Sequence, residues 1–331
     1  MPKRDEIQEE GEPPKKREKT DKNWNDMSNE IKVMIINNMD FITKTRLKMC
    51  SKADKCLVEA FPMVVTEIRA NLRSEWQRSE KVVFDDHKFS ADQHALRLWC
   101  LNDRVTVTKY EEEEKTRRFI SKESAFELFE SYFYKILTTE NLRVENFSTN
   151  WVLKDSCIPA DHMFHFDSVD IGCEESKECI KWLKYIAPGV KEITTGWECY
   201  VEKVGDISCV LSAQYIHLYK TDINNEQLIN FKATQLYLGM SMVTVDGIKK
   251  LVKKWINEDY PIGSNFNISF LSIPTPTIDQ FIDGEYDEVE THGSTSKIMV
   301  QTGSNKVMCI ELKKPNFDRS YTVKGNILNK T

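Results

Sequence analysis

The sequence contains no long apolar run. Its uninterrupted apolar stretches reach only a few residues, far short of the roughly 20 that a transmembrane helix requires. The first residues also lack the apolar core of a secretory signal peptide. We therefore expect a protein without a membrane span that stays inside the cell, in the cytoplasm.

Recognisable catalytic motifs are missing as well. The sequence has no phosphate-binding glycine loop, no Walker loop and no Gly-x-Ser-x-Gly nucleophile elbow. Its net charge of −6 argues against a general affinity for nucleic acid, because phosphates demand a basic surface. We predict no catalytic residue and no cofactor.

Cysteine is present, but without a pattern that indicates disulfides or a metal. The nine cysteines are odd in number and scattered, so we expect reduced and mostly buried thiols. His162 and His165 have the spacing of a ligand pair, with Cys157 and Cys173 on either side. The segment Phe164–Val169 alternates like a strand, however, which points neighbouring side chains to opposite faces. We therefore predict no metal site.

Residues 1–22 are predicted to be a disordered charged tail. They hold seven basic and seven acidic residues, with Met1 and Ile7 as the only large apolar groups. The run Lys15–Lys19 contains the Lys-Arg-x-Lys pattern of a basic nuclear-import signal. A solvated charge run is the more common meaning of such a pattern, so nuclear import is the alternative to a cytoplasmic location.

The range 23–62 is predicted to form three short helices. Their expected N-caps are Ser28, Thr43 and Ser51, and Pro62 ends the last one. In the first helix the residues that share one face, and are expected to join a core, are Ile31, Met34, Ile35 and Met39. Val33 and Ile36 lie off that face, so the helix is apolar on two sides.

A unit of about 40 residues buries little surface, and its second apolar face favours docking on a partner. From the pattern alone, a helical cap on the following domain remains an alternative.

These helices resemble an F-box of the form found in nematode proteins. The matching residues are Trp24, Met27–Ile31, Met39–Asp40 and Arg46–Ser51. The sequence departs from the family pattern at Ser28, where proline is usual, and at Met27, where leucine is usual. Serine still caps a helix, so we expect the fold to be retained. The property that the departure at Ser28 affects is the strength of adaptor binding.

The resemblance implies docking on a Skp-type adaptor and, through it, on a cullin. It places these residues at the adaptor contact or in support of it: Met27, Ser28, Glu30, Ile31, Val33, Ile35, Ile36, Met39 and Leu47.

The range 63–120 is predicted to be a connecting segment. It begins with mixed apolar and charged residues and continues as an irregular polar stretch. Val105–Thr108 alternates like a strand, and Glu111–Glu114 is expected to be a solvated loop.

A helix is predicted to begin at Ser121. The residues on its core face are Ala125, Phe126, Phe129, Phe133 and Leu137.

A loose strand and helix alternation follows. Strands are predicted at Leu142–Val144, Val169–Ile171, Glu192–Thr194, Tyr215–Leu218, Gln235–Leu238 and Asn267–Phe270. Helices are predicted at Ser176–Ile186, Asn225–Phe231 and Val245–Ile256. The strand spacing predicts an α/β fold in the form of an irregular arc that is like a leucine-rich repeat, with a concave strand face open to a partner. A doubly wound α/β domain is the competing fold, although such a domain normally contains a phosphate-binding glycine loop, which this sequence lacks.

This half also resembles the F-box-associated region of the nematode families. The resemblance is carried by Met242–Ile248 and Val252–Ile256. A C-terminal β-hairpin is predicted from Lys297–Val300 and Val307–Ile310, joined through Gly303–Asn305. The resemblance to the F-box-associated region implies that residues 121–331 recruit the protein to be ubiquitinated.

The sequence is compatible with three functions. The leading hypothesis is the substrate-recruiting subunit of a Skp–cullin–F-box ubiquitin ligase, which makes and breaks no bond itself. The second is a non-catalytic interaction scaffold that no longer binds the adaptor. The third, a small-molecule enzyme in the C-terminal domain, requires a pocket with convergent polar groups.

Overall fold

The computed structural model describes residues 23–39, 41–61, 63–70, 72–73, 83–84, 87–91, 94–101, 104–110, 114–120, 125–173, 175–196, 199–272, 274–283, 290–302, 305–315 and 320–330. The tail predicted over 1–22 lies outside them. The chain divides into two compact units, residues 1–39 and residues 40–331. In the described part of the chain, no helix is both long and apolar enough to cross a membrane.

The first unit contains a short helix with a serine cap. The 3-10 turn η1 (Trp24–Asp26) precedes α1 (Asn29–Asn37). The Oγ atom of Ser28 accepts a hydrogen bond from the Ile31 N–H at 3.5 Å, which confirms the predicted N-cap. The Lys32 ammonium lies 5.7 Å from the centre of the Trp24 ring, within cation–π range.

The buried side of α1 is not the side predicted. Ile36 is fully buried, whereas Ile31 and Met34 expose 49% and 66% of their surface. The prediction that Ile31 and Met34 join a core is therefore wrong. A spacing of three or four residues identifies a helical face, but nothing in the spacing tells which of two apolar faces is buried.

Two helices begin the second unit: α2 (Phe41–Lys48) and α3 (Lys52–Glu59). The Oγ atom of Ser51 accepts a hydrogen bond from the Asp54 N–H at 3.0 Å, which confirms this predicted cap. The cap predicted at Thr43 is wrong, because α2 begins two residues earlier. A threonine is tolerated inside a helix, where its hydroxyl can bond a carbonyl of the preceding turn. Lys48 and Glu59 form an ion pair of 2.9 Å between the two helices.

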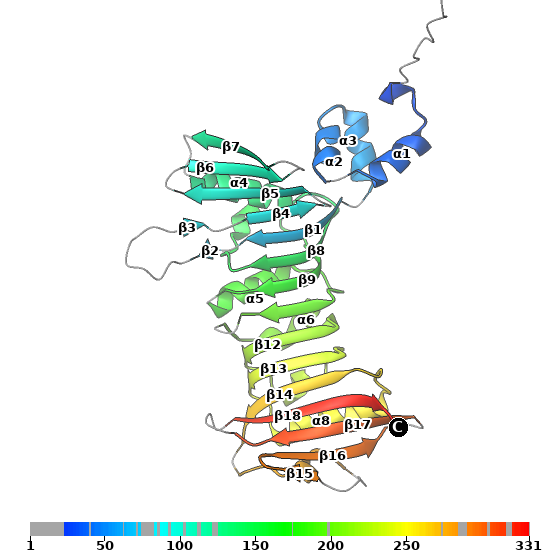
Figure 1. Cartoon of the computed structure of the whole chain (residues 1–331), viewed down its shortest axis with the longest axis vertical. Helices are drawn as coiled ribbons and strands as arrows, with labels where there is room; N and C mark the ends of the chain where they lie inside the picture. The colour runs from blue at the N-terminus through cyan, green and yellow to red at the C-terminus, as the bar shows by residue number, and fades with distance from the viewer. Residues whose placement is uncertain are drawn as a thin grey trace, which may run out of the picture. The chain divides into compact units, whose positions relative to one another are not determined.

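A mixed sheet runs through the second unit (Figure 1). Its described strands lie in the order β15-β16-β17-β18-β14-β13-β12-β10-β9-β8-β1-β4-β5-β6-β7, with β11 beside β12. Two short strands, β2 (Leu72–Arg73) and β3 (Val83–Phe84), form a separate pair.

The first strands of this sheet were only partly predicted. β1 (Met63–Ala70) lies parallel to β8 and antiparallel to β4. An antiparallel meander follows with β4 (His87–Ala91), β5 (His94–Leu101), β6 (Arg104–Tyr110) and β7 (Glu114–Ile120). The strand predicted at Val105–Thr108 is confirmed within β6. The irregular stretch predicted before it is wrong, because β4 and β5 pair with each other and β5 pairs with β6, and this cross-strand pairing has no clear local alternation to indicate it. Of the acidic run, residues 111–113 lie outside the described residues.

The next six strands are parallel and follow the chain in order: β8 (Leu142–Thr149), β9 (His165–Ile171), β10 (Glu192–Thr195), β12 (Tyr215–Thr221), β13 (Gln235–Ser241) and β14 (Asn265–Leu271). Each predicted strand of this series is confirmed. The short strand β11 (Tyr200–Val201) pairs with β12.

Helices connect the strands. They are α4 (Ala125–Leu137), α5 (Ser176–Tyr185), α6 (Ser208–Ser212), α7 (Asn225–Leu228) and α8 (Val245–Asn257), with the 3-10 turns η2 (Asp155–Cys157), η3 (Val204–Asp206) and η4 (Ile278–Phe281). The helices predicted at the positions of α5, α7 and α8 are confirmed. In α4 the predicted core residues Phe133 and Leu137 are buried, while the start at Ser121 and the side chains of Phe126 and Phe129 lie outside the described residues.

The C-terminal end of the sheet is antiparallel. β15 (Glu290–His292), β16 (Thr295–Gln301) and β17 (Lys306–Lys313) are joined by pairing that includes Ile298 opposite Ile310, which confirms the predicted hairpin strands. Gly303 and Ser304 of the turn lie outside the described residues. A further strand that was not predicted, β18 (Ser320–Asn329), lies between β17 and β14.

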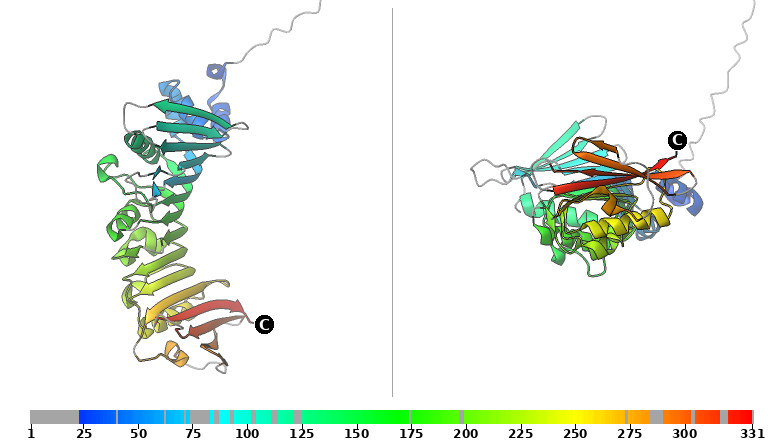
Figure 2. Two further views of the ribbon diagram at one scale, coloured as in Figure 1. Left: turned by 60° about the vertical axis from the view of Figure 1, so that its left-hand side comes forward. Right: turned by 90° about the horizontal axis from the view of Figure 1, so that it is seen from below.

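The helices of the parallel series cover one face of the sheet (Figure 2). Trp182 of α5 is fully buried, with its ring 5.1 Å from Phe147 of β8, and its Nε1–H donates to the Trp151 carbonyl oxygen at 2.7 Å. Trp255 of α8 lies 5.3 Å from Phe266 of β14. The core is therefore between the helices and this face.

The alternate residues of the same strands point to the opposite face, where Figure 2 shows none of α5, α6, α7 and α8. We call this surface the open face. Its residues on β9 to β14 are Ser168, Asp170, Glu192, Thr194, Tyr215, His217, Tyr219, Gln235, Tyr237, Gly239, Asn265, Asn267 and Ser269.

Candidate interaction surfaces

The start of α1 combines a cap with exposed apolar groups. A hydrogen bond from the Ser28 side chain lowers the pKa of Glu30, and the Glu30 backbone N–H lowers it further. Glu30 is therefore ionised at neutral pH, at the helix end where the macrodipole favours negative charge. Beyond it the exposed side chains of Ile31 and Met34 form what we call the α1 surface. Exposed apolar groups at helical spacing are typical of a docking helix.

The residues predicted to contact an adaptor differ in their exposure. Ser28, Glu30 and Ile31 are exposed, and Ile36 is fully buried. The partly exposed ones are Met27, Val33, Ile35, Met39 and Leu47. All except Leu47 lie in the first unit, whereas Leu47 lies on α2 in the second. In this conformation Ile36 offers no surface to a partner.

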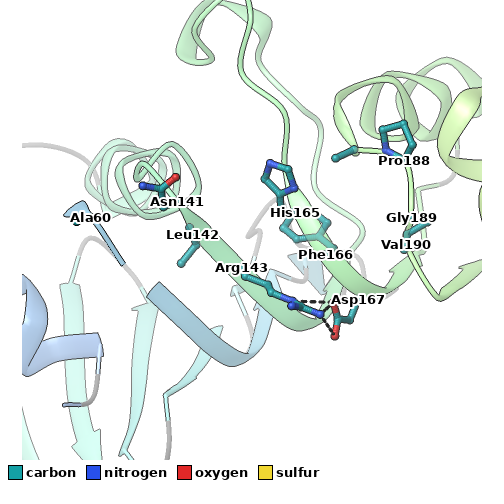
Figure 3. A pocket seen from close by; sticks show the side chains of 11 residues that line it. Ala60, Asn141, Leu142, Arg143, His165, Phe166, Asp167, Pro188, Gly189 and Val190 are labelled. Carbon is teal, nitrogen blue, oxygen red and sulfur yellow. Dashed lines mark hydrogen bonds and ion pairs between the residues drawn. The ribbon is translucent and has the colours of Figure 1, made fainter. Parts of the chain in front are cut away.

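A polar pocket of about 410 Å³ opens where β8 and β9 begin (Figure 3). The Arg143 guanidinium contacts both carboxylate oxygens of Asp167, at 2.7 and 3.0 Å, and Lys191 Nζ lies 3.0 Å from Asp167 Oδ2. Partial burial would raise the pKa of Asp167, but the hydrogen bonds from Lys191 and Arg143 outweigh this effect and lower the pKa. Because these charges satisfy one another, the pocket is better explained as a structural ion-pair cluster than as a ligand site.

Aromatic side chains gather on the open face. The ring of His217 lies 4.3 Å from Tyr219 on its own strand and 4.0 Å from Tyr237 on β13. Tyr215 completes the group, with its ring 6.4 Å from His217. We call these four residues the aromatic cluster. All four are partly exposed, so their rings are available to a partner.

An apolar pocket of about 650 Å³ adjoins this cluster where β11 to β14 end. Four large apolar side chains that line it are strongly exposed: Tyr200 at 42%, Met240 at 54%, Met242 at 66% and Leu271 at 62%. Tyr219 and Tyr237 of the aromatic cluster also line it. We call it the strand-end pocket. A concentration of exposed apolar side chains around a hollow marks an interaction site.

Two carboxylates lie on the other side of the aromatic cluster. The cross-strand register places Glu192 of β10 opposite Tyr215, and Asp170 one row further, opposite Thr194. Desolvation raises the pKa of Asp170 and the negative charge of Glu192 adds to the rise, with Arg69 opposing it. Neither carboxylate has an ion-pair partner within 4.0 Å among the described residues. Burial lowers the pKa of His217, against the pull of Glu192. The two carboxyl side chains make this part of the open face acidic in composition.

The residues weighed for metal binding have other contacts. His162 Nε2 lies 3.1 Å from the carbonyl oxygen of Leu137, and the Cys173 thiol donates to the Trp151 carbonyl at 3.5 Å. Across the described ranges, no three His, Cys, Asp or Glu side chains are placed to hold a metal ion. The cysteines with described side chains are free thiols, and Cys173, Cys179, Cys199, Cys209 and Cys309 are buried.

Sequence reasoning did not identify the aromatic cluster or the strand-end pocket. A signal was present, since Tyr215, His217 and Tyr219 alternate with the buried Ile216 and Leu218. Large rings at the positions that alternate with a buried set lie on one face of a sheet. The partners on β13 and β14 could not be assigned in the same way, because they depend on cross-strand register.

Comparison with known proteins supports an F-box relationship at a distance. The chain is 21% identical to an F-box protein of Caenorhabditis elegans over 260 residues, which cover 71% of this chain and 67% of that protein. No family model matches the chain, and no solved structure matches it. The chain is thus distantly similar to an F-box protein.

Proposed function

We propose that this protein is the substrate-recruiting subunit of a Skp–cullin–F-box ubiquitin ligase. The observation that carries the proposal is the α1 surface: a serine-capped helix, in the segment that matches the F-box pattern, exposes Ile31 and Met34. The similarity to an F-box protein supports it. In this function α1 docks on a Skp-type adaptor, which links the chain to a cullin.

The exposed and the buried residues have different roles in this proposal. Ile31, with Met34 beside it, supplies the apolar contact, and Glu30 supplies charge at the start of the helix. Ile36 holds the helix in place. The remaining predicted contacts of the first unit, Met27, Val33, Ile35 and Met39, are partly exposed and are proposed to contribute to the same docking. Leu47, on α2 of the second unit, stays a predicted contact.

The second unit holds the target in this proposal. Six parallel strands in chain order, with helices on one face, are consistent with an irregular arc like a leucine-rich repeat, and they leave the open face for a partner. The chain forms and breaks no bond. It raises the effective concentration of a target lysine near the ubiquitin-carrying enzyme.

Co-purification of the full chain with a Skp-type adaptor tests the proposal. The double variant Ile31→Asp, Met34→Asp places two charges on exposed positions, so it should fold and lose adaptor binding. The matched control Asn29→Asp, Asn37→Asp adds the same charge at exposed positions of α1 without removing apolar surface, and should retain binding. Equal capture of both variants, or no capture of the parent chain, would count against the ligase function.

A second function, an interaction scaffold that no longer binds the adaptor, is favoured by one observation. Ser28 stands where the F-box pattern has proline. If the parent chain fails to bind the adaptor, the variant Ser28→Pro separates the two readings. Binding gained by this variant identifies a scaffold derived from a ligase receptor.

A further inference from the structure

The open face carries three features in adjacent positions that together indicate the chemistry of a partner. They are the acidic pair Asp170 and Glu192, the aromatic cluster, and the strand-end pocket. The register connects them directly, because Thr194 of β10 pairs with His217 of β12, which pairs with Tyr237 of β13. A single bound segment can therefore touch all three.

The acidic pair and the aromatic rings favour a cationic side chain. Glu192 accepts one hydrogen bond, from the Ser168 hydroxyl at 3.2 Å, which leaves most of its acceptor capacity unused within the described residues. Tyrosine faces attract ammonium and guanidinium groups, and the planar guanidinium also stacks on them. An arginine side chain would satisfy both the carboxylates and the rings.

The strand-end pocket favours a large apolar side chain. Its exposed lining is mainly methionine, leucine and tyrosine, which adapt to apolar side chains of different shape. One cation lines it, Lys220, and this group disfavours a second positive charge in the pocket. The two chemistries therefore occupy different ends of the surface.

The spacing between these ends fits an extended peptide. β10 and β14 are separated by β12 and β13, and neighbouring strands lie about 4.8 Å apart, so the two ends are roughly 15 to 18 Å apart on a diagonal across the face. An extended chain advances about 3.4 Å per residue. A segment of about four to six residues covers this distance.

We propose that the open face binds an extended peptide segment of another protein, with an arginine held by Glu192, Asp170 and the aromatic cluster and a large apolar side chain in the strand-end pocket. This inference rests on the proposed function, whose target side it specifies. Its test uses the chain without any adaptor, so a failure of peptide binding and a failure of adaptor binding are distinguishable.

The test begins with a phage library of random 12-residue peptides panned against the full chain. Counter-selection uses the pocket variant Met242→Asn, Leu271→Asn, whose two positions are exposed and should tolerate the change. Enriched peptides are synthesised and titrated by fluorescence anisotropy. We expect a basic residue about four to six positions from a large apolar one.

Three variants then assign the two ends of the peptide. The pocket variant should weaken binding at least about tenfold, since it removes apolar contacts of the anchor. The charge variant Asp170→Asn, Glu192→Gln should weaken it about fivefold and reduce its dependence on salt. The control Val152→Asn, Ile262→Asn changes residues that are 49% and 51% exposed and do not line the pocket, and should stay within about twofold of the parent.

The inference is overturned if no peptide distinguishes the chain from the pocket variant. It is equally overturned if the enriched peptides lack a basic residue, or if the charge variant binds them as tightly as the parent does.

Discussion

Replacing Ser28 tests whether the departure from the F-box pattern changes the helix or only its contact with a partner. Ser28 has φ −65° and ψ 156°, and φ near −65° is the value that proline imposes. Met27 has ψ 144°, which suits a residue that precedes proline. Within the described residues the Ser28 N–H donates no hydrogen bond. The variant Ser28→Pro should therefore fold without strain, and Ser28→Ala removes the cap alone.

The size of each effect follows from the cap geometry. Loss of an N-cap typically costs about 1 kcal/mol. The Oγ to N distance of 3.5 Å is at the long limit for a hydrogen bond, so we expect about 0.5 kcal/mol for Ser28→Ala. Proline loses the same bond but restricts the unfolded chain, which contributes about 0.4 to 1 kcal/mol of stability. The net change for Ser28→Pro should be close to zero or slightly stabilising.

Amide hydrogen exchange of α1 in the full chain measures both effects locally. Exchange should be about twofold faster in Ser28→Ala than in the parent, and no faster in Ser28→Pro. Adaptor affinity measured in parallel should fall by about the same factor for Ser28→Ala and should not fall for Ser28→Pro. Faster exchange in Ser28→Pro than in Ser28→Ala would refute the reasoning, because it would mean that the backbone at this position does not accommodate proline.

Three further predictions concern the second unit. Asp167→Asn should lower the free energy of unfolding by about 1 kcal/mol at pH 7, since its two basic partners are largely exposed. The pKa of Asp167 is lowered in the folded chain, so its contribution is complete above the unfolded value of about 3.9 and is lost as pH falls through the folded value. Urea unfolding should thus show a gap between parent and variant that shrinks from pH 7 to pH 3, and a constant gap would contradict this account. Gly239→Ala should destabilise the sheet by more than about 2 kcal/mol, because a Cβ atom there would meet the Tyr219 carbonyl oxygen far inside contact distance. An unchanged thermal unfolding temperature in this variant would show that the strands separate at little cost. Trp182→Phe should lower the free energy of unfolding by about 2 to 4 kcal/mol, because it leaves a cavity and removes the indole hydrogen bond to the Trp151 carbonyl. A decrease of less than about 1 kcal/mol, measured by urea unfolding, would argue against a rigid core here.

The parallel series was predictable because each strand has a short apolar signature and a separate helix. Leu236 and Leu238, for example, alternate within β13 and are buried, and α8 has a strong apolar stripe that includes Leu251 and Trp255. β18 was not predictable by the same reading. Its buried Tyr321, Val323 and Ile327 alternate with polar residues, but it returns from the C-terminal end to pair beside β14, and nothing local indicates that long-range pairing.

The site was predictable only where one helix carries it. The cap at Ser28 and the exposed Ile31 lie within four residues, so local spacing is enough to bring them together, although not to tell which face is exposed. The open face requires residues from five strands, β9, β10, β12, β13 and β14, to be aligned across the sheet. A shift of one residue in the pairing of β12 with β13 would move Tyr237 to the helix side and Leu236 to the open face.

Gly239 lies where the pairing of β12 with β13 meets the strand-end pocket. The close approach of Gly239 to the Tyr219 carbonyl leaves no room for a Cβ atom there. The rings of Tyr219 and Tyr237, with centroids 5.9 Å apart, line the same pocket as Gly239. This close strand approach and the pocket therefore meet at one glycine, and the peptide experiment tests whether the pocket binds a side chain.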